Sequence, residues 1–327
     1  MPEVSASLIV YGTLMFLGIL GNVLVLITVI SNTLENKTLP ASDLILANLT
    51  VINFLICIFR NSVVFTNGLG LEVLLTASWC KFFMFIWSVL RSMSVWGTFS
   101  MSIFHYIHIS NQALKLRRNI LLKTSKALGL LWIFNFFYYT PALLYTAQAQ
   151  RNVTFSVQLV SSSTRPIMGC VWNFPNPDSS LLYVTASLVI HELIPIFLMM
   201  STNIITLCIL NQHSKAIAVQ TTIKRMASER RAARIITVLV ILFVICWGTN
   251  VLAVNVYNFT QGSSSTQFLL TIANITGSVF VGFSPLVLLV GHSKLRGKLK
   301  NLLCKYWNIK IKPSEAAAST VITVVNF

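Results

Sequence analysis

The chain has 327 residues, of which 55% are hydrophobic and only 10% are charged, and its formal net charge is +16. Soluble proteins carry about 25% charged residues, so this composition excludes an ordinary soluble globular domain. The shortage of charge extends along the whole chain, which indicates one membrane domain rather than two soluble ones. A basic surface for nucleic acid does not fit such long apolar segments, so we expect no nucleic-acid partner.

The first apolar segment, Leu8–Ile30, has no charged residue over its 23 residues. A cleavable signal peptide has an apolar core of about 7–15 residues, whereas a membrane-spanning helix needs about 20. The segment is therefore predicted to span the membrane. Six more segments of spanning length follow it, namely Leu44–Phe65, Phe82–Ile109, Ala127–Ala147, Leu181–Leu210, Ile235–Phe259 and Phe268–Val290. We therefore expect an all-α membrane protein with a seven-helix bundle in residues 1–292.

The distribution of Lys and Arg predicts the orientation of this bundle. With the N-terminus outside, nineteen of the 24 basic residues fall in the inner loops and the tail, and only Arg151 and Arg165 fall in the outer loops. Cytoplasmic loops are enriched in Lys and Arg, so the N-terminus is predicted outside and the C-terminus in the cytoplasm. Basic residues collected on the inner face of the membrane then account for the net charge of +16.

The predicted outer loop of residues 148–180 contains Asn152-Val153-Thr154, an acceptor for N-linked glycosylation. Cys170 lies in the same loop, and Cys80 opens the third helix on the outer side. These are the only two cysteines predicted to face the oxidising side of the membrane. A disulfide between them is predicted to hold the loop over the mouth of the bundle, and two free thiols are the alternative.

Residues 293–306 carry leucines on one helical face and lysines on the other. This pattern predicts a short amphipathic helix on the inner leaflet, followed by a disordered cytoplasmic tail in residues 307–327. Cys304, near the end of that helix, either carries a palmitoyl chain or is an unmodified thiol.

Three charged residues, Arg60, Arg91 and Glu192, lie inside predicted helices, where a charge costs about 2.5–3.5 kcal/mol. Arg91 either anchors an anionic group of a ligand or forms an internal ion pair with Glu192. The two interpretations are compatible, since a ligand carboxylate can displace Glu192. Arg60 is expected to be structural or to snorkel outward.

The sequence contains no Gly-x-Ser-x-Gly, His-Glu-x-x-His or phosphate-loop motif. We therefore expect no catalytic residues, no metal site and no cofactor, and hence a protein that is not an enzyme. Transporters often contain internal repeats, and the two halves of this chain show none. A small-solute transporter or channel is the weaker alternative.

The third predicted helix carries a pattern that resembles a known family. The pattern consists of Cys80-Lys81, Arg91-Ser92-Met93-Ser94-Val95, Thr98, Ser102-Ile103-Phe104 and Ile109-Ser110. It resembles the third-helix signature of vomeronasal type-1 receptors, including the related fish olfactory receptors, which are rhodopsin-like G-protein-coupled receptors. Weaker matches lie in the second, fourth and seventh helices, at Leu49–Asn53 with Arg60, at Leu131–Asn135 and at Ser284-Pro285.

Other residues depart from this family or resemble a second one. Asn53 replaces the acidic residue that rhodopsin-like receptors usually carry in the second helix, which puts a sodium site in doubt. Gly291-His292-Ser293-Lys294-Leu295 is similar to bitter taste receptors, which are the runner-up. Cys80 and Cys170 favour the vomeronasal type, because bitter taste receptors generally lack this pair.

The resemblance implies a receptor of the plasma membrane that binds a small odorant or pheromone and activates a heterotrimeric G protein. The ligand is expected in the outer half of the bundle. An anionic ligand would suit an arginine anchor. Depth in the helices and resemblance to receptor pockets predict the binding residues Trp87, Arg91, His191, Glu192, Asn250 and Asn274.

Overall fold

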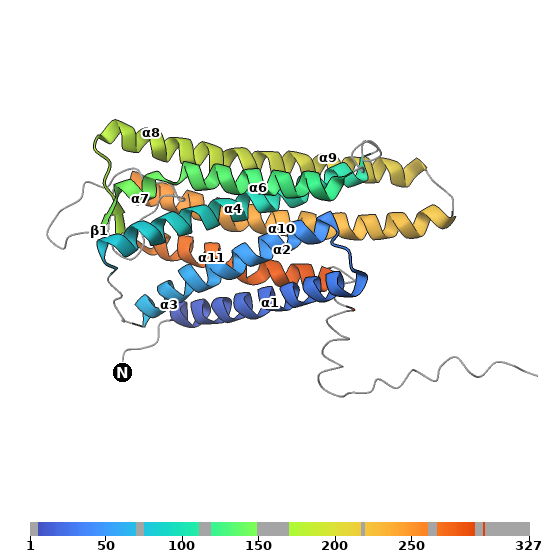
Figure 1. Ribbon diagram of the computed structural model, residues 1–327, viewed down its shortest axis with the longest axis horizontal. Helices are drawn as coiled ribbons and strands as arrows, with labels where there is room; N and C mark the ends of the chain where they lie inside the picture. The colour runs from blue at the N-terminus through green and yellow to red at the C-terminus, as the bar shows by residue number, and fades with distance from the viewer. Residues whose placement is uncertain are drawn as a thin grey trace, which may run out of the picture.

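The computed structural model describes residues 6–69, 75–110, 119–148, 170–216, 220–260, 267–291 and residue 297. Over these residues the chain forms long helices that lie side by side along the longest axis of the molecule (Figure 1). Seven helical segments are long and apolar enough to cross a membrane, which confirms the predicted number of spans. The all-α seven-helix bundle is therefore the fold of this protein.

Four of the spans are formed by single helices, and three are divided into shorter pieces. The single helices are α1 (Ala6–Asn36), α4 (Ala77–Ile109), α10 (Gln220–Phe259) and α11 (Gln267–Gly291). The second span consists of α2 (Ala41–Ile56), η1 (Cys57–Asn61) and α3 (Ser62–Gly68). The fourth consists of α6 (Ile120–Tyr138) and α7 (Pro141–Tyr145), and the fifth of α8 (Pro177–Leu188), η2 (Val189–Leu193) and α9 (Ile194–Ala216).

The two short pieces η1 and η2 are π-helical turns inside otherwise regular spans. The amide of Ser62 bonds to the carbonyl of Cys57, and the amide of Ile194 bonds to that of Val189, in each case five residues earlier. Pro195 is the second residue after η2, and its ring nitrogen cannot supply the amide of a regular helical hydrogen bond. The extra residue in each turn changes which side chains face the bundle.

This change of register brings pairs of consecutive polar residues into the protein interior. In η1, Arg60 and Asn61 are 4% and 1% exposed; in η2, His191 and Glu192 are 1% and 3% exposed. Polar residues inside a membrane protein are costly and commonly mark a functional site, as π-helical turns themselves do.

Helix α4 lies at the centre of the bundle, where it contacts α2, α6, α9 and α10. Every residue from Trp87 to Val95 is buried, so this helix has no face for lipid along that length. By contrast, large apolar side chains such as Phe137 and Phe197 are exposed on the outer surface of the bundle, as expected for contact with lipid tails.

Strands β1 (Thr146–Gln148) and β2 (Cys170–Trp172) form an antiparallel two-stranded sheet that pairs Gln148 with Cys170. The sheet lies at the end of the bundle where α1, α4 and α8 begin (Figure 1). We call the half of the bundle next to the sheet the sheet-side half. The predicted amphipathic helix of residues 293–306, the tail of residues 307–327, Asn152 and Cys304 lie outside the described residues.

Candidate ligand-binding site

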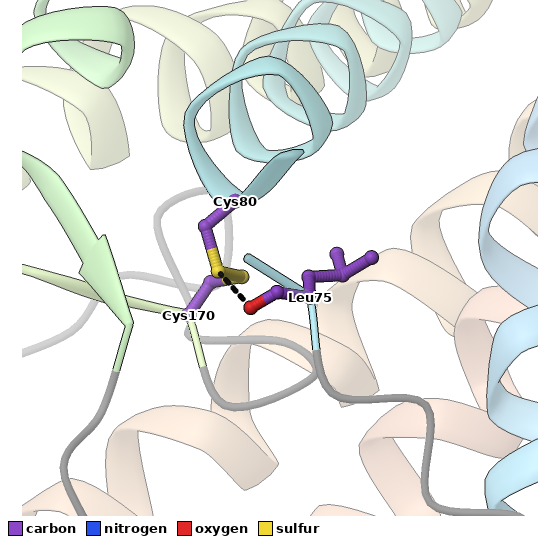
Figure 2. Close-up of a disulfide and its surroundings, with 3 residues drawn as sticks. All are labelled: Leu75, Cys80 and Cys170. Carbon is purple, nitrogen blue, oxygen red and sulfur yellow. Dashed lines mark hydrogen bonds between the residues drawn. A yellow bond between two sulfur atoms is a disulfide. The ribbon is translucent and has the colours of Figure 1, made fainter. Parts of the chain in front are cut away.

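The sheet is joined to the bundle by a disulfide between Cys80 and Cys170. Figure 2 shows Cys80 on the first turn of α4 and Cys170 at the start of β2, so the bond ties the loop to the central helix. The predicted disulfide is confirmed. The carbonyl oxygen of Leu75 lies 3.9 Å from Cys80 Sγ; since a disulfide sulfur carries no proton, we regard this as a close contact rather than a hydrogen bond.

Below the sheet, Arg91 of α4 is the centre of a buried polar cluster. Its Nη2 donates to Glu192 Oε1 at 3.2 Å and to Asn250 Oδ1 at 3.3 Å, and its guanidinium carbon lies 4.6 Å from the centre of the Trp247 ring. Asn250 Nδ2 in turn donates to the carbonyl of Ala273. The cluster therefore joins α4, η2, α10 and α11 inside the protein.

A second cluster surrounds Arg60 of η1. Its terminal nitrogens donate to Asn274 Oδ1 at 3.0 Å, to Ser278 Oγ at 3.2 Å and to Asn61 Oδ1 at 3.2 Å. Its guanidinium carbon lies 5.1 Å from the centre of the Trp87 ring. Arg60 therefore points into the bundle, which agrees with the expected structural role and rules out the alternative that it snorkels outward. The π-helical turn explains the difference, because it rotates this position toward α11.

Gly277 of α11 lies between the two clusters. A Cβ atom added at Gly277 would lie 3.5 Å from Asn250 Nδ2 and 3.7 Å from both terminal nitrogens of Arg60. These distances are ordinary van der Waals contacts, so this position borders Asn250 and Arg60 at the same time. The clusters of Arg60 and Arg91 therefore lie next to each other at α11, and we call the two together the polar layer.

His191 lies in a third polar group, on the side of α4 that faces α6. Its Nδ1 lies 2.6 Å from Ser92 Oγ and accepts a hydrogen bond of 3.3 Å from Trp96 Nε1. Ser92 Oγ also lies within hydrogen-bond distance of Asn135 Oδ1 of α6, so its single proton serves one of these two acceptors at a time. Because an indole nitrogen can only donate, Nδ1 must carry a lone pair. The neutral ring therefore holds its proton on Nε2.

Aromatic rings connect His191 to the sheet. Its ring centre lies 4.4 Å from that of Tyr138, which stacks on Tyr183 at 5.6 Å. Tyr183 lies 5.3 Å from both Trp172 of β2 and Phe174. The rings form a continuous aromatic layer between the sheet and the polar interior.

The structure brings the six predicted binding residues together to different degrees. Arg91, Glu192 and Asn250 are in direct contact. Trp87 and Asn274 join them through Arg60 rather than through Arg91, and His191 lies in the neighbouring group around Ser92. The predicted ion pair between Arg91 and Glu192 is present.

Sequence reasoning missed the roles of Arg60 and Trp247. The burial cost of a charge inside a helix marked Arg60 as unusual, but its partners on α11 are more than 200 positions away in the sequence. Trp247 follows Cys246 within an apolar segment, and no local pattern indicates that an arginine from α4 lies against its ring.

Comparison with known proteins assigns this architecture to a family. The family model described as taste receptor protein (TAS2R) matches residues 2–307. The chain belongs to this family of G-protein-coupled receptors. It is 36% identical over 319 residues to olfactory receptor class A-like protein 4 of Danio rerio, an alignment that covers 93% of this chain and 91% of that protein.

More distant relatives agree with the receptor class. Olfactory receptor class A-like protein 1 of Danio rerio is 23% identical over 298 residues, which cover 86% of this chain and 88% of that protein. Galanin receptor type 1 of Rattus norvegicus is 26% identical over 253 residues, which cover 74% of this chain but only 65% of that receptor. This family membership makes the chain a multi-pass membrane receptor with a ligand and a G protein as partners, not an enzyme. The receptor assignment takes the place of the transporter or channel alternative. The narrower assignment to vomeronasal type-1 receptors stays a prediction.

Proposed function

We propose that this receptor is chemosensory, that it resides in the plasma membrane with its N-terminus outside, and that it binds a small odorant or pheromone in the sheet-side half of the bundle. The relative named olfactory receptor class A-like protein 4 supports the olfactory sense. The disulfide between Cys80 and Cys170 also supports the olfactory assignment, because the resemblance to vomeronasal receptors includes this cysteine pair.

The observation that carries the proposal is the position of Arg91. It holds α4, η2 and α10 together through Glu192, Asn250 and Trp247. A ligand group that replaces one of these contacts changes how strongly three helices are held to one another. Such a ligand shifts the population of bundle conformations only if it binds the active one more tightly. The inner ends of the helices then engage the heterotrimeric G protein.

An anionic group is the ligand chemistry that suits Arg91 best. Hydrogen bonds between guanidinium and carboxylate are stronger than those between neutral groups, and Glu192 already makes one at 3.2 Å. A ligand carboxylate competes with Glu192 for the same donors and removes one of the contacts that hold η2 to α4. The proposed binding residues are Trp87, Arg91, His191, Glu192, Asn250 and Asn274.

A bitter taste receptor is the second candidate, and the family model that matches the chain favours it. The same polar site serves either sense. The two candidates differ in the cells that make the receptor, so localisation of its messenger RNA in olfactory or in taste epithelium distinguishes them.

A G-protein reporter assay in cells tests the proposal. The wild type, Arg91→Gln and the control Trp79→Phe are compared at equal surface expression with small aromatic acids, amines and neutral odorants. Trp79 is a suitable control because it lies on the same helix but is 60% exposed. We expect an acid response in the wild type and in Trp79→Phe that Arg91→Gln loses. Silence of a well-expressed wild type toward every class of compound would contradict the proposal.

A further inference from the structure

Two tryptophans of the site share an unusual environment. Trp87 carries the guanidinium of Arg60 against its ring, and Trp247 carries that of Arg91. Each tryptophan is only 3% exposed. The indole nitrogen of each is buried and has no hydrogen-bond partner among the described residues.

A buried donor without a partner carries the full penalty of its lost hydration. Native proteins satisfy nearly all such groups, so each exception calls for an explanation. Two of them in one polar layer, both on tryptophans that face an arginine, are explained if a bound molecule supplies the missing partners.

The chemistry of the indole group limits what this molecule can be. An indole nitrogen donates and cannot accept a hydrogen bond, so the matching ligand atom must be an acceptor. A protonated amine has only donors and would also be repelled by the guanidinium on the same ring. An oxygen with negative charge is attracted by that guanidinium as well as by the indole N–H.

The two indoles belong to one site rather than to two separate ones. Trp87 and Arg91 are four residues apart on α4, so their side chains are neighbours on one face of the helix. Arg60 and Asn250, a partner of Arg91, both lie next to Gly277 of α11. The two indoles therefore belong to one group of neighbouring side chains.

We infer that the ligand carries two hydrogen-bond acceptors, at least one of them anionic, on an apolar body, and that these acceptors pair with the indole N–H groups of Trp87 and Trp247. This inference rests on the proposed function and names the ligand class. Arg60 with Trp87 forms one subsite, and Arg91 with Trp247 forms the other. Neutral oxygens of Asn274 and Ser278, which now contact Arg60, are weaker partners for it than a carboxylate.

Direct binding to the purified full-length receptor in lipid nanodiscs tests this inference. The probes are α,ω-dicarboxylates of increasing chain length, with monocarboxylates and α,ω-diamines of the same lengths for comparison. At one optimal length we expect the dicarboxylate to bind about tenfold more tightly than the monocarboxylate, as one additional charge-assisted contact provides. Diamines are expected not to bind.

Variants of the receptor show which side chains the two carboxylates of the probe contact. Trp87→Phe and Trp247→Phe keep an aromatic face for the guanidinium and remove only the donor. Each is expected to weaken dicarboxylate binding by about 3–10-fold, while Trp79→Phe has no effect. Arg60→Gln is expected to reduce the dicarboxylate to the affinity of the monocarboxylate. Where a phenylalanine variant folds poorly, benzothienylalanine, which carries sulfur in place of the indole N–H, provides the same test.

Several results would overturn the inference. These are dicarboxylates that bind no better than monocarboxylates or not at all, diamines that bind equally well, or tryptophan variants with unchanged affinity. The proposed function is judged separately by the reporter response of the wild type. A response to amines or neutral odorants alone would still support the receptor function. It would contradict only the inference that the ligand carries two acceptors.

Discussion

Arg91 Nη2 lies 3.2 Å from Glu192 Oε1, and the two side chains are 4% and 3% exposed. The contact joins the central helix to a π-helical turn of the fifth span. Since both charges are withdrawn from water, each depends on the other for compensation. The pair is therefore a structural link between these helices and, in our proposal, the contact with which a ligand competes.

Removal of one member of this pair is expected to destabilise the receptor more than removal of both. Arg91→Gln or Glu192→Gln alone leaves a buried charge without its partner and should cost about 3–5 kcal/mol. The double variant Arg91→Gln/Glu192→Gln should lose less than either single variant, because it leaves no unpaired charge. Thermal unfolding of the purified receptor, analysed as a double-mutant cycle, measures the difference. Additive losses would show that the two charges do not stabilise each other.

Loss of the disulfide is expected to have the same effect whichever cysteine is replaced. Cys80→Ala, Cys170→Ala and the double variant each remove the same bond and should lower stability by about 2–4 kcal/mol. Cys208→Ala is the matched control, because Cys208 is a free and exposed cysteine of α9. Thermal unfolding measures the losses, and mass spectrometry of non-reduced peptides identifies the bond. A double variant clearly less stable than either single variant would contradict this reasoning.

The polar contacts of Asn53 with Ser284 and Ser94 predict that sodium does not stabilise this receptor. Asn53 donates to Ser284 Oγ at 3.2 Å and accepts from Ser94 Oγ at 3.0 Å, so all three side chains are neutral. A buried cation needs a compensating negative charge. Exchange of sodium for N-methyl-glucamine should therefore leave the melting temperature of the wild type unchanged. Asn53→Asp should gain stability with sodium concentration, as expected for a bound ligand. A wild type that melts higher in sodium would contradict the prediction.

Close packing between α1 and α11 makes Gly282 sensitive to substitution. A Cβ atom there would lie 3.0 Å from the backbone oxygen of Leu14, which cannot move aside as a side chain can. Gly282→Ala should therefore cost about 1–3 kcal/mol. A Cβ atom at Gly248 of α10 meets no atom within 4 Å, so Gly248→Ala should instead stabilise its helix by about 0.5–1 kcal/mol. Thermal unfolding compares the two variants, and equal effects would show that packing at Gly282 is loose.

Much of the fold could be predicted because its signals are local. The charge-free length of Leu8–Ile30 is enough to identify a span, since the thickness of the hydrocarbon layer requires about 20 residues. The pairing of Cys80 with Cys170 followed from the small number of cysteines on one side of the membrane. The cost of a buried charge pointed to Arg91 and Glu192 as important residues.

The contacts of the site were less accessible to such reasoning. Which helix face meets which neighbour depends on helix rotation, and a single extra residue in a π-helical turn changes it. Arg60 contacts α11 rather than the membrane surface for this reason. His191 is adjacent to Glu192 in the sequence, yet its partners are Ser92 and Trp96 rather than Arg91.

The sequence by itself determined the number of spans, the separation of apolar from charged segments and the cysteine pair, because these follow from the chemistry of each residue and from the thickness of a bilayer. Only the tertiary structure decided that Arg91 lies against Trp247, that Arg60 faces Trp87, and that both arginine clusters lie next to Gly277. Those relationships join helices far apart in the chain, and the packing of the whole bundle selects them.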